Sequence, residues 1–169
     1  MTKLNASKMS YKEALKISKK LPDYKYLLSV GSVESKQPFP QDLDFLTTIN
    51  LKLLSNKFIK KFPETWNKTK LGLKRFDYYP IIDGKKIVIN IWKVDKNNLH
   101  FFYFTYGYPR GFVIAMRKKA KLMGYKLSQY GLFKNNKKIK ELTTLKKIFK
   151  FFKLPYRSPE EEYLKHKKK

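Results

Sequence analysis

The sequence predicts an α+β fold in two parts, a larger sheet-containing part up to residue 105 and a smaller basic part over 106–169. Strand pairs and amphipathic helices are mixed along the chain, without a regular β-α-β alternation. The closely spaced Gly107, Pro109 and Gly111 indicate a hinge or a boundary between the two parts. With 169 residues, 42% of them apolar, the chain can bury a real hydrophobic core in one large domain or two small ones.

Helices and strands follow one another irregularly in the first part. The helices are expected over 10–21 and 51–62, and the strands over 24–30, 42–49, 71–82 and 86–94. Apolar residues recur at helical spacing in both helices, and Pro22 and Pro63 follow their ends. Asp83-Gly84, between the last two strands, is the strongest hairpin signal in the chain.

The second part has fewer strand signals. After the aromatic run over 99–105, which ends the first part, it has an expected helix over 112–123, a small hairpin over 125–139 and a last helix over 145–153. Gly124 is placed to cap the first of these helices, and Thr143 or Thr144 the second. The lysine-rich tail over 165–169 is expected to be disordered.

The charge balance indicates a polyanionic partner. The chain has 39 Lys and Arg residues against 13 Asp and Glu residues, a formal net charge of +26. An excess this large attracts nucleic acid or an anionic membrane surface. The basic residues are spread along the whole chain and are not confined to one amphipathic helix, which favours nucleic acid over a membrane.

Cysteine is absent, which excludes disulfides, thiolate metal sites and cysteine nucleophiles. The two histidines, His100 and His166, provide no material for a Ser-His-Asp arrangement. We find neither a signal peptide nor an apolar stretch of membrane-spanning length. These features together predict an intracellular protein without a membrane partner.

Asp42 and Asp44 form the pattern with the clearest chemistry. Alternate residues of a strand point to one face, so the two carboxylates are directed at the same place. Charges that close repel each other unless a cation lies between them. Gly31-Ser32 precedes this strand as a turn that can offer backbone N–H groups to phosphate. We therefore favour a site for one or two magnesium ions carrying a nucleoside triphosphate over solvated loop or cap residues.

Four motifs, in this order along the chain, resemble those of the family X DNA polymerases. They are Gly31-Ser32 with Asp42-Leu43-Asp44, then Tyr103-Phe104-Thr105, then Met116-Arg117 with Gly124-Tyr125, and finally Tyr156-Arg157-Ser158-Pro159. The run over 125–135 is similar to that of a small viral member of the family. The likeness covers nearly the whole chain, which is too short for the lyase and fingers regions of larger members.

The resemblance implies a polymerase beta-like nucleotidyltransferase palm with a mixed sheet over 1–105. It also implies a small α+β, thumb-type subdomain over 106–169 that binds DNA and nucleotide. The implied activity is template-directed filling of short gaps in DNA repair, including base excision repair, by two-metal-ion transfer from dNTP to a primer 3′-OH. The implied partners are gapped or primer-template DNA, dNTP and two Mg²⁺ ions, with Mn²⁺ as an alternative metal. The protein is expected to act as a monomer.

The resemblance also implies roles for residues of the first part. Asp42 and Asp44 would hold both metal ions and act in catalysis. Gly31 and Ser32 would contact the outgoing phosphates of the nucleotide.

At the end of the first part, the segment Tyr103-Phe104-Thr105 would border the nucleotide sugar and help to exclude a ribose 2′-OH. Arg117 would contact the template strand or the minor groove near the new base pair. Lys118 and Lys121, on the same predicted helix, suit contacts to the DNA phosphates.

Asn90 departs from the family pattern, because the family has a third catalytic aspartate at this position of a later palm strand. An amide is a poorer magnesium ligand than a carboxylate and cannot take the proton from a primer 3′-OH. We predict an engineered Asp-to-Asn substitution that binds substrates without turnover, or else a natural variant of low activity. The intact surroundings favour the engineered interpretation. The simpler alternative is a strand residue outside the site.

Two further departures concern neighbouring loops. Val33-Glu34-Ser35 stands where the family has an arginine after Gly-Ser, with Lys36 as a substitute for phosphate contact. Tyr106 stands where the family has glycine, and the following linker is longer than usual.

Two alternative functions remain open at the level of the sequence. One is a template-independent or RNA-directed nucleotidyltransferase with the same two-metal palm. The other is a non-catalytic nucleic-acid-binding protein with a decayed metal site. A viral origin, with a location in the host cytoplasm or the virion, rests on the resemblance alone.

Overall fold

The computed structural model describes residues 6–167, and the chain divides into two compact units, Met1–Val94 and Asp95–Lys169. The boundary between the units therefore lies before the aromatic run over 99–105, not after it at 105/106 as the sequence predicts. This run is helical, and its rings pack into the core of the second unit. Each unit has its own hydrophobic core.

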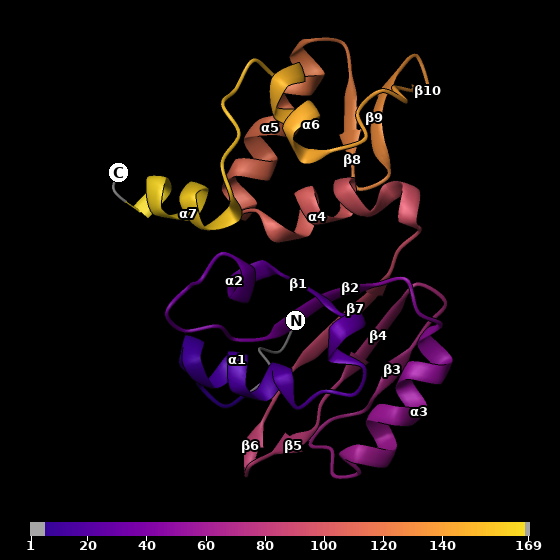
Figure 1. Ribbon diagram of the computed structural model, residues 1–169, viewed down its shortest axis with the longest axis vertical. Helices are drawn as coiled ribbons and strands as arrows, with labels where there is room; N and C mark the ends of the chain where they lie inside the picture. The colour runs from indigo at the N-terminus through magenta and orange to yellow at the C-terminus, as the bar shows by residue number, and fades with distance from the viewer. Residues whose placement is uncertain (1–5, 168–169) are drawn as a thin grey trace. The chain divides into compact units, whose positions relative to one another are not determined.

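A mixed sheet of five strands forms the first unit, in the order β1-β2-β7-β4-β3 (Figure 1). The strands are β1 (Leu28–Val30), β2 (Leu43–Thr47), β7 (Ile89–Lys93), β4 (Arg75–Tyr78) and β3 (Lys70–Leu71). β2 and β7 run parallel, and the other neighbouring pairs are antiparallel. The predicted α+β class with a mixed sheet is confirmed.

The predicted hairpin around Asp83-Gly84 is formed by β5 (Ile81–Ile82) and β6 (Lys85–Lys86). Asp83 and Gly84 both have a positive φ, of 51° and 72°. That conformation is the one that a two-residue type I′ turn requires.

Helices of the first unit pack on one face of its sheet. They are α1 (Tyr11–Lys19), η1 (Tyr24–Tyr26), α2 (Gly31–Glu34) and α3 (Leu51–Lys61). α1 begins with a capping box between Ser10 and Glu13, and Asn50 caps α3. The core joins apolar residues of α1 and α3 to Phe45 and Phe76 of the sheet, which leaves the opposite face free to carry other side chains.

The second unit combines helices with a small antiparallel sheet, β10-β9-β8. Its elements are η2 (Lys96–Asn98), α4 (Leu99–Gly107), α5 (Arg110–Leu122), β8 (Lys126–Ser128), β9 (Gly131–Lys134), β10 (Lys137–Lys138), α6 (Leu145–Phe151) and α7 (Pro159–Lys167). Stacked and tilted rings of Phe104, Phe112 and Phe149 fill the core.

The tail prediction is wrong for residues 165–167, which belong to α7. The predicted disorder at residues 168 and 169 lies outside the described residues. Among the helices that the structure describes, none has both the length and the apolar character to cross a bilayer.

Candidate functional site

Three polar residues lie in one row across the sheet of the first unit. Asn90 on β7 is the cross-strand partner of Asp44 on β2 and of Asp77 on β4. Residues directly opposite each other on neighbouring strands point to the same face of a sheet. The flanking residues of β2, Leu43 and Phe45, belong to the core on the other face. The alternation of apolar and polar residues therefore gathers the three polar side chains on the face opposite the core.

The amide of Asn90 joins the two predicted metal ligands. Its Nδ2 donates to Asp44 Oδ1 at 2.8 Å and to Asp42 Oδ2 at 3.4 Å. Asn90 is buried, with 7% of its surface exposed. The structure thus brings Asp42, Asp44 and Asn90 together, as the sequence predicts.

Burial makes the carboxylate pair difficult to ionise fully. Desolvation raises the pKa of Asp42. Desolvation first, and then the charge of Asp42, raise the pKa of Asp44 to about 7. The hydrogen bonds from Asn90 and the charge of Arg75 act in the opposite direction on both groups. A cation between the two oxygens would relieve the repulsion, which is the physical reason to regard this pair as a metal site.

The donor set fits one divalent cation that also binds a substrate. Two carboxylates, together with phosphate oxygens, are ligands of the kind that Mg²⁺ prefers. Within residues 6–167, no group of three or more His, Cys, Asp or Glu side chains is arranged to hold a metal ion. A cation bound by Asp42 and Asp44 would therefore depend on further oxygens from the substrate or water.

Gly31 lies directly behind the carboxylate of Asp44. Its φ is +67°, and a Cβ at this position would approach Asp44 Oδ2 to 2.6 Å. Both the backbone conformation and the space require glycine here. Gly31 and Ser32 begin the short helix α2, so the expected Gly-Ser turn is the first turn of a helix. The Ser32 Oγ atom is buried and has no hydrogen-bond partner among the described residues.

Arg75 and Asp77 are site residues that the sequence-based analysis missed. Arg75 Nε donates to Asp77 Oδ1 at 2.5 Å, and Arg75 Nη2 donates to Asn90 Oδ1 at 3.3 Å. The guanidinium carbon lies 5.0 Å from the centre of the Trp92 ring. The sequence signal that could have found them is the alternation along β4. Phe76 is apolar and faces the core, so Arg75 and Asp77 on either side of it point to the polar face. The register that sets Asp77 beside Asn90 is not readable from the sequence.

The segment Tyr103-Phe104-Thr105 lies on α4 of the second unit. Phe104 is 1% exposed in the core, so it could contribute to a sugar site only through its backbone. Tyr103 and Thr105 are half-buried. A Cβ on Gly107 would lie 3.4 Å from the Tyr103 ring, in ordinary van der Waals contact.

α5 carries the predicted DNA-binding residues on its exposed face. Arg117, Lys118 and Lys121 are exposed, whereas Met116 and Ala120 are buried. Lys119 differs from its neighbours because its Nζ donates to the carbonyl oxygen of Phe152 at 2.7 Å. The helix therefore presents a row of cations whose ammonium and guanidinium groups face solvent.

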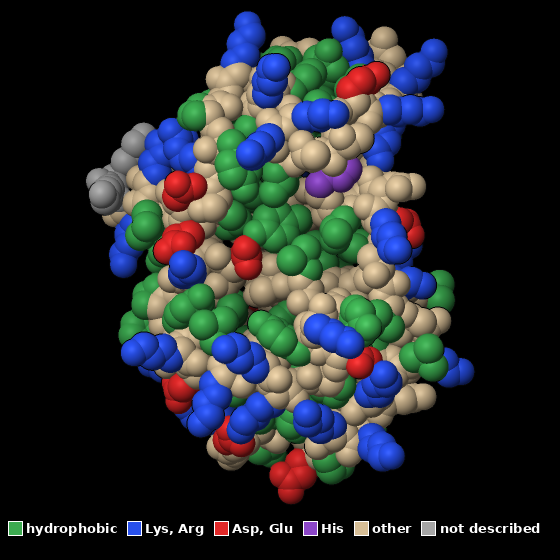
Figure 2. Space-filling view, viewed as in Figure 1, with side chains coloured by type: hydrophobic (Ala, Val, Ile, Leu, Met, Phe, Trp, Pro, Cys, Tyr) green, Lys and Arg blue, Asp and Glu red, His purple; other side chains and the backbone are tan. Residues whose placement is uncertain are grey.

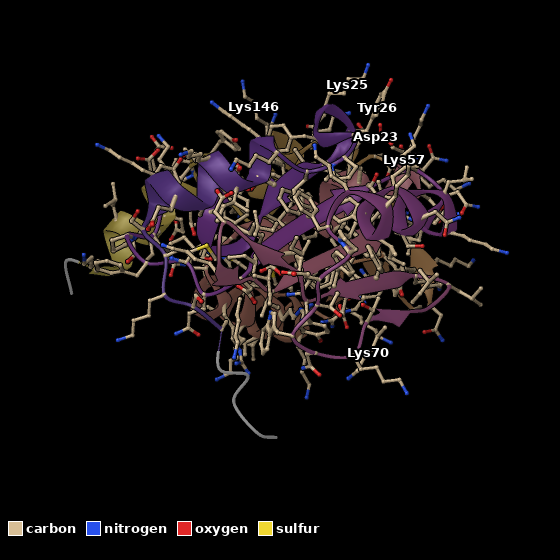
Figure 3. All side chains as sticks on the ribbon, turned by 90° about the horizontal axis from the view of Figure 1, so that it is seen from below. Asp23, Lys25, Tyr26, Lys57, Lys70 and Lys146 are labelled. Atoms are coloured by element: carbon tan, nitrogen blue, oxygen red, sulfur yellow. The ribbon has the colours of Figure 1, made fainter. Side chains whose placement is uncertain are left out.

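Lys and Arg side chains are spread over the face shown in Figure 2, and acidic side chains are few there. Part of this charge is neutralised within the first unit. Lys57 of α3 and Asp23 form an ion pair of 2.7 Å, and Lys25 lies over the ring of Tyr26, 4.9 Å from its centre. Figure 3 shows these four labelled residues gathered at one edge of that unit.

Comparison with known proteins identifies similar sequences and similar folds. A family model described as the DNA polymerase beta thumb matches residues 103–162. Two curated relatives named Repair DNA polymerase X come from a South African tick isolate and a Namibian warthog isolate of African swine fever virus. Each is 28% identical to this chain in an alignment of 150 residues, and the match covers 80% of this chain and 80% of the relative.

Two solved structures of Leishmania infantum polymerase beta share the fold. The match to the ternary P/T complex has a TM-score of 0.72 and 17% identity. It covers 92% of this chain and 77% of the Leishmania chain. The match to the ternary gap complex has a TM-score of 0.70 and 16% identity. It covers 92% of this chain and 71% of the Leishmania chain. At these identities the likeness establishes the fold, and the chemistry has to be argued from the residues of this chain.

Proposed function

We propose, from the relationship of this chain to the family X DNA polymerases, that it is a DNA-directed DNA polymerase that fills short gaps. The family resemblance predicted from the four motifs is confirmed by the matches in sequence, thumb segment and fold. Gap filling in repair agrees with the names of the relatives, which describe a repair polymerase and a gap complex.

The observation that carries the proposal is the convergence of Asp42 and Asp44 on one buried amide, with Gly31 directly behind them. Asp42 and Asp44 would hold Mg²⁺ or Mn²⁺ together with the triphosphate of an incoming dNTP. A divalent cation bound there would stabilise negative charge on the reacting oxygens of phosphoryl transfer. Ser32 Oγ, which has no hydrogen-bond partner among the described residues, is a suitable donor to the phosphates.

The second unit supplies the remaining groups in this proposal. Tyr103 and Thr105 would border the sugar of the nucleotide. Arg117, Lys118 and Lys121 on the exposed face of α5 would contact the DNA backbone. Such contacts position a duplex without reading its sequence, as a gap-filling enzyme requires.

We further propose that turnover is low, because Asn90 supplies no third carboxylate. The test is extension of a one-nucleotide gapped duplex by the chain and by its Asn90→Asp variant. A positioned general base contributes about 10²- to 10⁴-fold to a rate, so a gain of this order is expected from Asn90→Asp. Asp44→Asn in the Asn90→Asp background is the matched control and should abolish the gain. Absence of extension by all variants would overturn the proposal.

A non-catalytic DNA-binding protein is the second candidate function, and the amide at Asn90 is the observation that favours it. In that case Asn90→Asp would not extend the primer, and magnesium would leave nucleotide affinity unchanged. A template-independent or RNA-directed enzyme would instead extend a single strand as readily as the gapped duplex. The same assay, run on both substrates, separates these outcomes.

A further inference from the structure

Arg75 is a cation fixed on three sides beside the carboxylate pair. Asp77 accepts from its Nε, Asn90 Oδ1 accepts from its Nη2, and the ring of Trp92 lies against the guanidinium. The strands that carry these residues, β4 and β7, are neighbours in the sheet (Figure 1). A surface arginine normally samples many rotamers, so a side chain held by an ion pair, an amide and an aromatic face is pre-organised.

The orientation of the Asn90 amide follows from its partners. Arginine has only N–H donors, so the amide oxygen of Asn90 must face Arg75. Ionised Asp42 and Asp44 can only accept, so the amide nitrogen must face them. Reversing the amide would oppose donor to donor and acceptor to acceptor at the same time. A metal ligand needs an oxygen lone pair, and Asn90 therefore turns its non-ligating side toward the carboxylates.

The local charge also limits the number of cations. Asp77 is neutralised by Arg75 through their ion pair. Asp42 and Asp44 both feel the positive charge of Arg75, and Asp44 also feels the negative charge of Asp77. A second divalent cation would be repelled by the fixed guanidinium of Arg75. It would also meet the amide N–H of Asn90 where a third ligand oxygen is needed, so its binding is unfavourable.

Arg75 retains donors for a ligand. Its side chain is 50% exposed, whereas that of Asp77 is 12% exposed. Guanidinium has more N–H groups than the two that Asp77 and Asn90 use. The remaining ones can pair with phosphate oxygens in the forked geometry that arginine favours.

We propose that Arg75 takes the place of a second divalent cation, so that this site binds a single divalent ion with its nucleotide and Arg75 binds the substrate phosphates directly. Asp77 is the residue that positions Arg75. This inference rests on the proposed nucleotidyl-transfer function and identifies how the same site recognises its anionic substrate.

The first test counts bound ions. Mn²⁺ is titrated by electron paramagnetic resonance into the full chain with a gapped duplex that has a dideoxy-terminated primer and a non-hydrolysable dNTP analogue. One protein-dependent Mn²⁺ is expected for the wild-type chain. Asn90→Asp should bind a second ion weakly. Asn90→Asp with Arg75→Gln should bind it more tightly, because Arg75 no longer competes with it.

The second test measures affinity for a fluorescent dNTP analogue in the presence of Mn²⁺. Arg75→Gln should raise the Kd about tenfold or more, since a charge-assisted hydrogen bond to a phosphate is lost. Arg75→Lys keeps the charge without the fork and should restore part of the affinity. Asp77→Asn should weaken binding in the same direction. Lys60→Gln, an exposed cation on α3, is the matched control, and circular dichroism checks that every variant is folded.

Two outcomes would overturn the inference. One is two tightly bound Mn²⁺ ions in the wild-type complex. The other is a Kd for Arg75→Gln equal to that of Lys60→Gln. Failure of the proposed function gives a different result: a single Mn²⁺ with Arg75-dependent nucleotide binding, but no primer extension even by Asn90→Asp.

Discussion

Gly31 is the residue at which backbone and site geometry are most closely linked. Gly31→Ala would introduce a Cβ that meets Asp44 Oδ2 at 2.6 Å, in a backbone with φ +67°. The left-handed conformation alone costs about 1–2 kcal/mol with a side chain. We expect this loss in urea denaturation, together with weaker Mn²⁺ binding because the carboxylate of Asp44 is displaced.

Gly84→Ala is the matched control for this prediction. Gly84 has a similar φ of +72°, but a Cβ there would have no atom within 4 Å. It should cost a similar amount of stability and leave Mn²⁺ binding unchanged. Equal effects of the two substitutions on metal binding would contradict the proposed role of Gly31.

Asp44 predicts an unusual pH dependence for the metal-free protein. Its pKa is raised from 3.8 to about 7 by burial and by Asp42, so the folded state binds the proton more tightly than the unfolded state. The stability that this gives is present below pH 4 and is lost as the pH rises through 7. The loss is on the order of 2–4 kcal/mol, because one pKa unit corresponds to about 1.4 kcal/mol.

The measurement compares thermal unfolding of the wild-type chain and Asp44→Asn in EDTA between pH 4 and 7. Burial lowers the pKa of His100 and gives the opposite slope, but it does so in both proteins. Their difference therefore isolates the carboxylate pair. Glu13, whose pKa is lowered to about 2, contributes only at more acidic pH. A difference that is flat across this range would contradict the assignment.

The residues of the candidate site were predictable to different degrees. Asp42 and Asp44 follow from strand alternation alone, and Gly31 and Asn90 follow from motif order. Arg75 and Asp77 could not be found in this way, because they reach the site only through the pairing of β4 with β7. Cross-strand register depends on the packing of the whole sheet, which short-range patterns do not encode.

At the scale of elements, the N-cap of α6 gives a local test of the second unit. Thr144 accepts from the backbone N–H of Lys147, and the helix places Ile148 and Phe149 in the core. Thr144→Ala should destabilise the protein by about 1 kcal/mol, since an N–H at the helix start loses its partner. Thr143→Ala is the control, because Thr143 accepts only from the exposed Lys147 Nζ. Faster amide exchange at Lys147 in Thr144→Ala alone would locate the effect, and equal exchange in both variants would contradict it.

Several elements were predicted from local signals, whereas the helices α4 and α7 were missed. The Asp83-Gly84 turn and the cap at Thr144 are encoded within a few residues, and the sequence predicts them. The aromatic run over 99–105 shows no alternation and few polar residues, because α4 is buried on several sides. The helix α7 begins at Pro159, with Glu160, Glu161 and Glu162 in its first turn. Those signals favour a helix start, but the adjoining lysines obscured them.

The whole molecule carries a charge of +26, and much of it is displayed on the surface (Figure 2). The two compact units both carry part of this charge, and they differ in how their charged groups are placed. The first unit brings Asp42, Asp44 and Asp77 together around Asn90, and the second exposes the basic face of α5. We infer that DNA affinity depends mainly on the cations whose charged groups face solvent, and not on the total number of lysines.

The salt dependence of DNA binding tests this inference. If about six phosphates are neutralised, the slope of log K against log salt concentration should be near −5 for duplex DNA. Lys118→Gln should make the slope less steep by about 0.9, the value for one lost phosphate contact. Lys119→Gln removes the same charge from the same helix, but its ammonium already serves the Phe152 carbonyl, so the slope should stay unchanged. Fluorescence anisotropy with a gapped duplex between about 50 and 200 mM salt measures both slopes. Equal changes for the two variants would mean that net charge, and not the exposed face of α5, determines how the protein holds DNA.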